Sequence, residues 1–137
     1  MAVRFEMERG NMEVIYAYTR AQAIADGVLV DVSEMGKEAG FRHPVALTDT
    51  VFNSYVRVPE GVDCQDEKGR LWDILWMLHV AIKRGANSKD RDGANLLLFE
   101  LCVRNDNESA KMVQLKAICG PGDDAEPVIT IMEVFDD

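Results

Sequence analysis

Cysteine is scarce in this chain, and histidine is scarcer. The three cysteines, Cys64, Cys102 and Cys119, are far apart, and no Cys-x-x-Cys or paired-His spacing brings ligands together. Zinc sites and dithiol redox motifs need such spacings, so the sequence predicts neither a metal nor a cofactor. An odd number of separated cysteines also argues against a disulfide framework and favours reduced thiols in a cytoplasm.

Long apolar runs and basic charge are also in short supply. No stretch is apolar enough to cross a membrane, and the opening MAVRFEMERG has acids where a secretory signal needs an apolar centre. The formal net charge is -9, from 15 basic and 24 acidic residues. Binding to a phosphate backbone depends on Lys and Arg, so we expect no direct binding of nucleic acid.

No basic residue follows Lys116, and the acids beyond it predict an acidic surface. They are Asp123, Asp124, Glu126, Glu133, Asp136 and Asp137. Such a surface attracts basic partner proteins. The simpler interpretation is that this charge keeps a small protein soluble.

Catalytic signatures are missing as well. The chain has no Gly-x-Ser-x-Gly elbow, dinucleotide fingerprint or paired-His metalloprotease motif, so no catalytic residue is predicted. The segment GPGDDAE, from Gly120, joins two expected strands instead of leading into a helix, as a phosphate-binding loop would. Its acids match no calcium loop. We expect a type II turn with Pro121 second, Gly122 third and a solvated acidic tip.

The length of 137 residues suits one domain, with residues 1–12 frayed, although residues 3–7 have the composition of an edge strand. Thr19 and Gln22 form a capping box for a short helix that Gly27 ends. Further signals predict a strand at 28–32, a helix that Ser33 caps and Gly40 ends, and a helix after Thr48 and Asp49. Residues 86–95 are polar and predict a mobile loop.

Leucines and isoleucines at steps of three and four predict a long helix over residues 71–84, which is apolar almost all round. Alternating residues then predict strands at 96–104 and 111–119, and the apolar run PVITIMEVF predicts a third strand at 127–135. We therefore expect an α+β fold. Its antiparallel sheet is a C-terminal three-stranded meander, with the strand at 28–32 as an extension, and the long helix and several short ones cover one face while water covers the other.

Trp72, Asp73, Trp76 and His79 are the candidate ligand or partner surface. Positions 72 and 76 are one helical turn apart and 79 lies three further on, so the two indoles and the imidazole share one patch. Such a patch suits a planar ligand or a partner side chain, with His79 able to exchange protons near neutral pH. Core packing is the interpretation that we favour. Asp73 then marks the rim of the helix, with water or Arg70 as its partner.

Two groups of segments carry a family resemblance. YTRAQAIADGVLVDVSEMGKEAGFRHPVALT, and later GRLWDILWML with LKAICGPGDDAEPVITIM, cover most of residues 18–132. They resemble an uncharacterised family of small bacterial proteins, a domain of unknown function often met on plasmids, phages and other mobile elements. The resemblance implies a cytoplasmic protein accessory to mobile DNA and assigns no activity to any residue.

The activity itself stays unknown, and three hypotheses follow. The first is a non-enzymatic binding module whose acidic end meets a basic protein, for example a nucleic-acid enzyme whose DNA it imitates by charge. The second is a small enzyme or ligand binder that uses Trp72, Asp73, Trp76 and His79 in a cleft beside the loop at 86–95. The third is a homodimer formed through a sheet face that exposes Met112, Ile118, Ile129 and Ile131.

Overall fold

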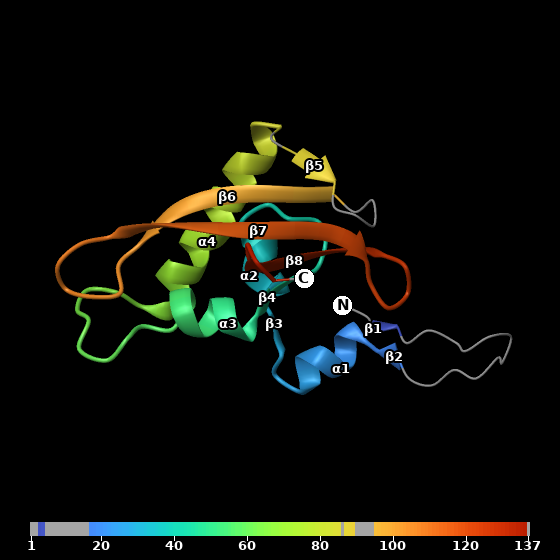
Figure 1. Cartoon of the computed structure of the whole chain (residues 1–137), viewed down its shortest axis with the longest axis horizontal. Coiled ribbons are helices and arrows are strands. Elements are labelled where there is room, and N and C mark those ends of the chain that lie inside the picture. Colours follow the sequence, from blue (N-terminus) through green and yellow to red (C-terminus); the bar gives the residue numbers. More distant parts are fainter. Residues whose placement is uncertain (1–2, 5–16, 86, 90–94, 137) are drawn as a thin grey trace, which may run out of the picture.

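The computed structural model describes residues 3–4, 17–85, 87–89 and 95–136. Helices and strands are interspersed along these residues (Figure 1). The strands are β1 (Val3–Arg4), β2 (Ala17–Tyr18), β3 (Leu29–Asp31), β4 (Val45–Thr48), β5 (Asn87–Lys89), β6 (Asn95–Val103), β7 (Lys111–Pro121) and β8 (Pro127–Glu133). The helices are α1 (Arg20–Ala25), α2 (Ser33–Glu38), α3 (Asp49–Val51), which continues into a π-helical turn η1 (Phe52–Val56), and α4 (Glu67–Lys83).

The main sheet is mixed, and its strand order is β3-β4-β8-β7-β6-β5. The meander of β6, β7 and β8 is present as predicted, with antiparallel pairing throughout. The expectation of a purely antiparallel sheet is wrong, because β4 runs parallel to β8. No pattern in the sequence predicts the strand β4 at Val45–Thr48. The predicted extension at 28–32 exists as β3, but it pairs with β4 at the edge.

The cap of α1 is confirmed in full. The Thr19 side chain accepts from the Gln22 backbone, the Gln22 side chain accepts from the Thr19 backbone, and Gly27 ends the helix with a φ of +79°. The cap of α2 differs from the prediction. Ser33 is the first residue of the helix, and its hydroxyl donates to Asp31 and accepts from the Val45 backbone N–H. This serine therefore links β3 to β4 instead of capping a helix.

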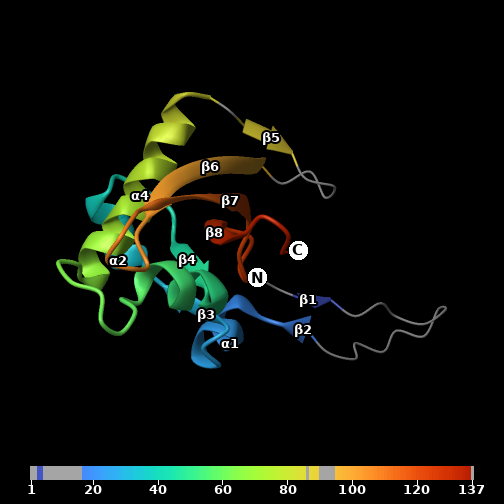
Figure 2. The same cartoon turned by 60° about the vertical axis from the view of Figure 1, so that its left-hand side comes forward.

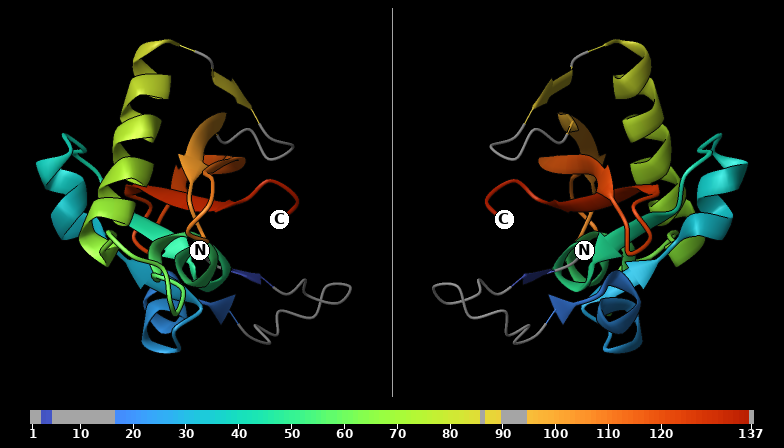
Figure 3. Two further views of the ribbon diagram at one scale, coloured as in Figure 1. Left: turned by 90° about the vertical axis from the view of Figure 1, so that its left-hand side faces the viewer. Right: turned by 90° about the vertical axis from the view of Figure 1, so that its right-hand side faces the viewer.

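Helix α4 supplies the centre of the core. It begins at Glu67, before the predicted start, because the Asp66 carboxylate accepts from the Gly69 backbone at 2.6 Å. Its buried side chains pack on the inward residues of the sheet: Leu71, Ile74, Leu75 and Leu78 from α4, and Leu97, Phe99, Leu101, Leu115 and Ile131 from the sheet. Figure 3 shows α4 and α2 on the same side of the sheet.

The prediction that water alone covers the opposite face of the sheet is wrong. Ala23 of α1 packs with Leu29 and Ala46, which point away from α4. Arg20 is buried there and donates to the Thr130 hydroxyl at 2.7 Å and the Ile129 carbonyl at 2.9 Å. Figure 2 shows α1 beside β1 and β2 at the β3–β4 end of the molecule. Helices therefore lie on both faces, although α1 covers the second face only around β3 and β4.

The predicted loop at 86–95 contains a strand, since Asn87–Lys89 forms β5 and pairs with the start of β6. Residues 86 and 90–94 lie outside the described residues, so the prediction of mobility is not tested there. The predicted fraying of residues 1–12 is not tested either, because all of them except Val3 and Arg4 lie outside the described residues. Within residues 3–7, Val3–Arg4 forms the predicted strand and pairs with β2.

The turn between β7 and β8 sits later than predicted. The Ala125 N–H donates to the Gly122 carbonyl, and Ala125, not Gly122, has the positive φ of 65°. The expectation of a type II turn over Gly120–Asp123 is therefore wrong. Gly122 is needed for space, because a Cβ there would overlap the Glu126 carboxylate and lie 2.9 Å from Val128.

Candidate functional site

The predicted aromatic cluster lies on the surface of α4. Trp72 and Trp76 stack with ring centroids 6.0 Å apart and planes at 10°, and Trp76 stacks on His79 at 5.3 Å and 18°. Trp72 is 36% exposed and Trp76 is 45% exposed. The interpretation as core packing is therefore wrong, whereas the shared patch is confirmed. We call Trp72, Trp76 and His79 the aromatic face of α4.

Asp73 lies on the same helix and is exposed, although partial burial raises the pKa of its carboxyl group. Arg70 is not its partner, contrary to the suggestion from the sequence. The guanidinium is buried and donates to the Tyr55 carbonyl, the Arg104 carbonyl, the Gln65 side chain and the Asn105 side chain. Asp73 therefore offers its carboxylate at the surface, while Arg70 is used inside the fold.

Apolar surface continues from the aromatic face toward strand β6. Trp76 and Asp73 line a hollow together with Met112, which is 63% exposed. Met77 and Arg84 of this hollow also line an adjoining one with Leu98 of β6, which is 43% exposed. The homodimer hypothesis counted four residues on an uncovered sheet face, and two of them are buried: Ile129 is 7% exposed and Ile131 is 0% exposed. Met112 is exposed as expected, and Ile118 is half-buried.

His79 also lines a cleft beside Asn95, which agrees with part of the prediction of a cleft near the loop at 86–95. Trp72, Asp73 and Trp76 do not line it. No sequence pattern predicts the other polar residues of this cleft, which are Arg42, His43 and Lys83. They lie in a connector and at a helix end, where no motif marks them.

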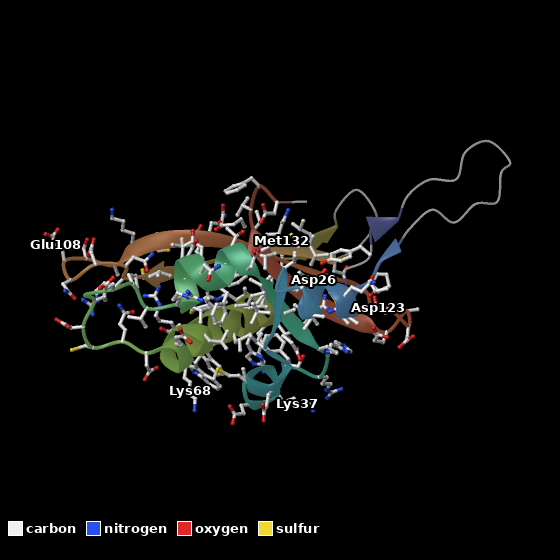
Figure 4. The ribbon with its side chains drawn as sticks, turned by 90° about the horizontal axis from the view of Figure 1, so that it is seen from below. Asp26, Lys37, Lys68, Glu108, Asp123 and Met132 are labelled. Atoms are coloured by element: carbon white, nitrogen blue, oxygen red, sulfur yellow. The ribbon has the colours of Figure 1, made fainter. Side chains whose placement is uncertain are left out.

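The predicted acidic residues do not form one surface. The Asp123 carboxylate accepts from the Arg20 backbone at 2.7 Å and the Ala21 backbone at 3.0 Å, and Figure 4 shows this residue beside α1. The bond from the Ala21 N–H and, to a smaller extent, the bond from the Arg20 N–H lower the pKa of the Asp123 carboxyl group. Asp123 is therefore a structural partner of α1 as well as a surface acid.

Glu133 does not belong to an exposed surface, since it is only 7% exposed and burial raises the pKa of its carboxyl group. Asp124 and Glu126 lie in the turn before β8, and Asp136 follows β8 at its other end. A strand of seven residues puts roughly 20 Å between these ends. Asp137 lies outside the described residues. The acids are thus divided between two places.

The cysteines are free, as expected: Cys64 and Cys102 are exposed, and Cys119 is half-buried. Burial raises the pKa of the Cys119 thiol. A thiol in such a setting is a poor nucleophile at neutral pH. Cys119 contributes its side chain to the lining of the cleft.

None of the helices in the described part of the chain has the length and apolar content needed to cross a lipid bilayer. Neither the curated proteins nor the solved structures give a significant match. One family model does match, over residues 6–137, and its description is Family of unknown function (DUF6573). The family resemblance seen in the sequence is to that extent confirmed, and the chain belongs to this family of unknown function.

Proposed function

We propose that the protein is a non-enzymatic binding module whose aromatic face on α4 receives arginine or lysine side chains of a basic partner protein. The observation that carries this proposal is the exposed stack of Trp72 on Trp76, with Asp73 next in sequence to Trp72. Large exposed aromatic groups in contact with one another are typical of protein interfaces, where Trp is over-represented among the residues that contribute most to binding.

The chemistry of the face favours a cation. An indole face attracts a guanidinium or ammonium group by about 0.5–1 kcal/mol at an exposed site, and by more when water is excluded. The Asp73 carboxylate can accept hydrogen bonds from the same group. Asp66, the N-cap of α4, lines one hollow together with Trp72 and adds negative charge there. A net charge of -9 would also speed the approach of a basic protein.

The neighbouring apolar residues suit the edge of such an interface. Met112 shares a hollow with Trp76, and methionine adapts its shape to different partners. The same surface could instead join two copies of this chain, which is the homodimer hypothesis. Sedimentation of the protein alone across a range of concentrations separates the two: a monomer supports a foreign partner, and a dimer that Met112→Glu dissociates supports self-association.

Three finer proposals rest on the resemblance and the composition alone. The protein would come from bacteria, act in the cytoplasm and be accessory to mobile DNA, which makes a basic nucleic-acid enzyme a reasonable partner. The exposed Asp124 and the half-buried Glu126 and Asp136 would then add long-range attraction to such a partner, since each contributes charge outside the aromatic face.

The direct test uses a fluorescently labelled peptide that carries three arginines separated by glycines, and the same peptide with citrulline, a neutral isostere of arginine. We expect saturable binding of the arginine peptide, seen as a rise in anisotropy. Trp76→Ala should weaken it roughly 10-fold, equivalent to about 1.4 kcal/mol, and Asp73→Asn should weaken it several-fold. Phe135→Ala is the matched control, because Phe135 is an exposed aromatic residue (82%) outside α4.

Equal binding of the arginine and citrulline peptides would contradict the proposal, as would binding that the Trp76 variant leaves unchanged. High salt should weaken the interaction, since exposed charges are screened. The wild-type protein and the Trp76→Ala variant can then be used as parallel baits in a host lysate. A protein that only the wild type captures would be tested for a basic binding segment.

A further inference from the structure

The cleft that His79 lines is separate from the hollows beside the two tryptophans. It lies between the loop after α2, the last turns of α4 and the inward residues of β6, β7 and β8, and its volume is about 360 Å³. Leu78, Leu97, Ala117 and Ile129 form an apolar floor, and each of them is buried. Small-molecule sites have volumes of roughly 300–1,000 Å³ and mostly apolar walls. The cleft has the size and floor of such a site.

The polar groups of this cleft are all neutral or basic. Arg42, His43, His79 and Lys83 contribute to its lining, and none of its lining residues, which all belong to the described part of the chain, is an aspartate or glutamate. The whole chain, in contrast, carries 24 acids against 15 bases. Two full positive charges and two imidazoles gathered around one apolar floor are complementary to an anion.

One side of the cleft is held in place by packing. The His79 ring stacks on Trp76, and the edge of Phe41 meets it at 6.0 Å and 89°. The backbone of Gly40 closes on the same ring: a Cβ there would lie 3.2 Å from Cε1 of His79, and the φ of +100° also favours glycine. This packing pre-organises the imidazole, which lowers the cost of binding a ligand beside it.

We propose that this cleft binds a small organic anion, with an apolar body on the floor of buried residues and a carboxylate, sulfonate or phosphate group toward Arg42 and Lys83. Both side chains are exposed and reach the cleft from different segments, one from the loop after α2 and one from the end of α4. An arginine can bind such a group through two parallel hydrogen bonds, and a lysine adds a point charge. This proposal goes beyond the function proposed above, since it concerns another site and a ligand of opposite charge.

The test compares 2-naphthoate, an anion with a flat apolar body, with the neutral isostere 2-naphthalenemethanol. The full chain, labelled in its alanine and isoleucine methyl groups, is titrated with each compound and followed by NMR. We expect saturable shifts of the Ala117 and Ile129 methyl signals with naphthoate, and weaker binding of the alcohol. The double variant Arg42→Gln/Lys83→Gln should bind naphthoate roughly 10-fold more weakly and the alcohol unchanged.

Lys68→Gln is the matched control, because Lys68 is an exposed cation in the first turn of α4, about 22 Å along the helix from Lys83. It should bind naphthoate as the wild type does. The methyl spectrum of each free variant shows whether it is folded. The proposal is overturned if these methyl signals do not shift with naphthoate up to about 10 mM, a tenfold excess over a Kd of 1 mM. Equal affinity for the two compounds, or no effect of the double variant, overturns it as well.

Discussion

At the scale of single residues, Asp123 joins two parts of the chain that are far apart in sequence. A helix leaves its first backbone N–H groups without partners inside the helix. In α1, Thr19 accepts from Gln22, while Asp123, from the turn between β7 and β8, accepts from Arg20 and Ala21. The carboxylate is also favoured by the positive end of the helix. The turn therefore completes the cap of a helix near the start of the chain.

Removing this carboxylate should destabilise the protein in a pH-dependent way. The bonds from Ala21 and Arg20 lower the pKa of Asp123 in the folded state, so their stabilisation is present above the unfolded pKa near 4. It is lost as the pH falls through the lower folded pKa. Asp123→Ala should therefore lower the melting temperature at pH 7, and its difference from the wild type should shrink as the pH falls below about 4.

Asp124→Ala is the control for this prediction, since it removes an exposed carboxylate from the same turn that makes no bond to α1. Its melting curve should stay close to that of the wild type at both pH values. A loss for Asp123→Ala that is equal at pH 7 and pH 3 would show that the turn, and not the ionised carboxylate, provides the stability.

At the scale of elements, Arg70 ties the start of α4 to three neighbouring segments. Its guanidinium donates to the Tyr55 carbonyl in η1 at 2.9 Å, to Gln65 in the preceding loop at 3.1 Å, and to the Arg104 carbonyl after β6 at 2.8 Å. A fourth bond reaches the Asn105 side chain at 2.6 Å. A buried charge is costly without partners, and here every arm of the guanidinium has one.

Arg70→Met keeps the apolar stem and removes these donors, so buried acceptors lose a partner. Each such loss costs about 1–3 kcal/mol, and we expect the free energy of unfolding to fall by about 3 kcal/mol in urea denaturation. Lys68→Met changes an exposed cation two positions earlier and should stay within about 0.5 kcal/mol of the wild type. Similar midpoints for the two variants would contradict a stabilising role for the Arg70 network.

The elements also show where sequence patterns succeed. A period of 3.6 predicted α4, and a period of 2 predicted β6 and β7, because each of these elements turns one face to the core over several turns or residue pairs. Strand β8 is buried from Val128 to Glu133, and its longer apolar run predicted it without any alternation. Strand β4 escaped because it has only four residues and three of them, Val45, Ala46 and Leu47, are buried, so no alternation marks it.

The candidate sites show the limit of such patterns. The spacing of Trp72, Trp76 and His79 predicted one shared patch, which is observed, but an apolar helix gives no sign of which hydrophobic face remains outside. Of the cleft, only the position of His79 near the loop at 86–95 was predicted, and its cationic residues were not. Arg42 and Lys83 are far apart in sequence, and only the packing of α4 against the sheet brings them to the same cleft.

At the scale of the whole molecule, stability depends on the strands at the centre of the mixed sheet. Leu47 of β4 is 0% exposed and packs in the core, next to the pairing with β8. In Figure 1, α4 runs across the strands β6 and β7. The β3–β4 unit therefore extends the core that α4 and the meander enclose.

Leu47→Ala should lower the free energy of unfolding by about 3 kcal/mol, because it removes buried methyl groups and leaves a cavity. Leu98→Ala makes the same chemical change on β6, where the side chain is 43% exposed, and should cost less than about 1 kcal/mol. Urea denaturation of both variants checks the difference. Equal losses would mean that β4 is not part of the cooperative core.

The position of β8 between β4 and β7 has a consequence for synthesis on the ribosome. Strand β4 ends at Thr48, whereas β8 begins at Pro127, so the edge of β4 that β8 will cover has no partner until much more of the chain has emerged. Strand β7 likewise emerges before the neighbour that joins it to β4. Both open edges can pair with other nascent chains in that interval. The protein is thus most exposed to aggregation just before its central strand is translated.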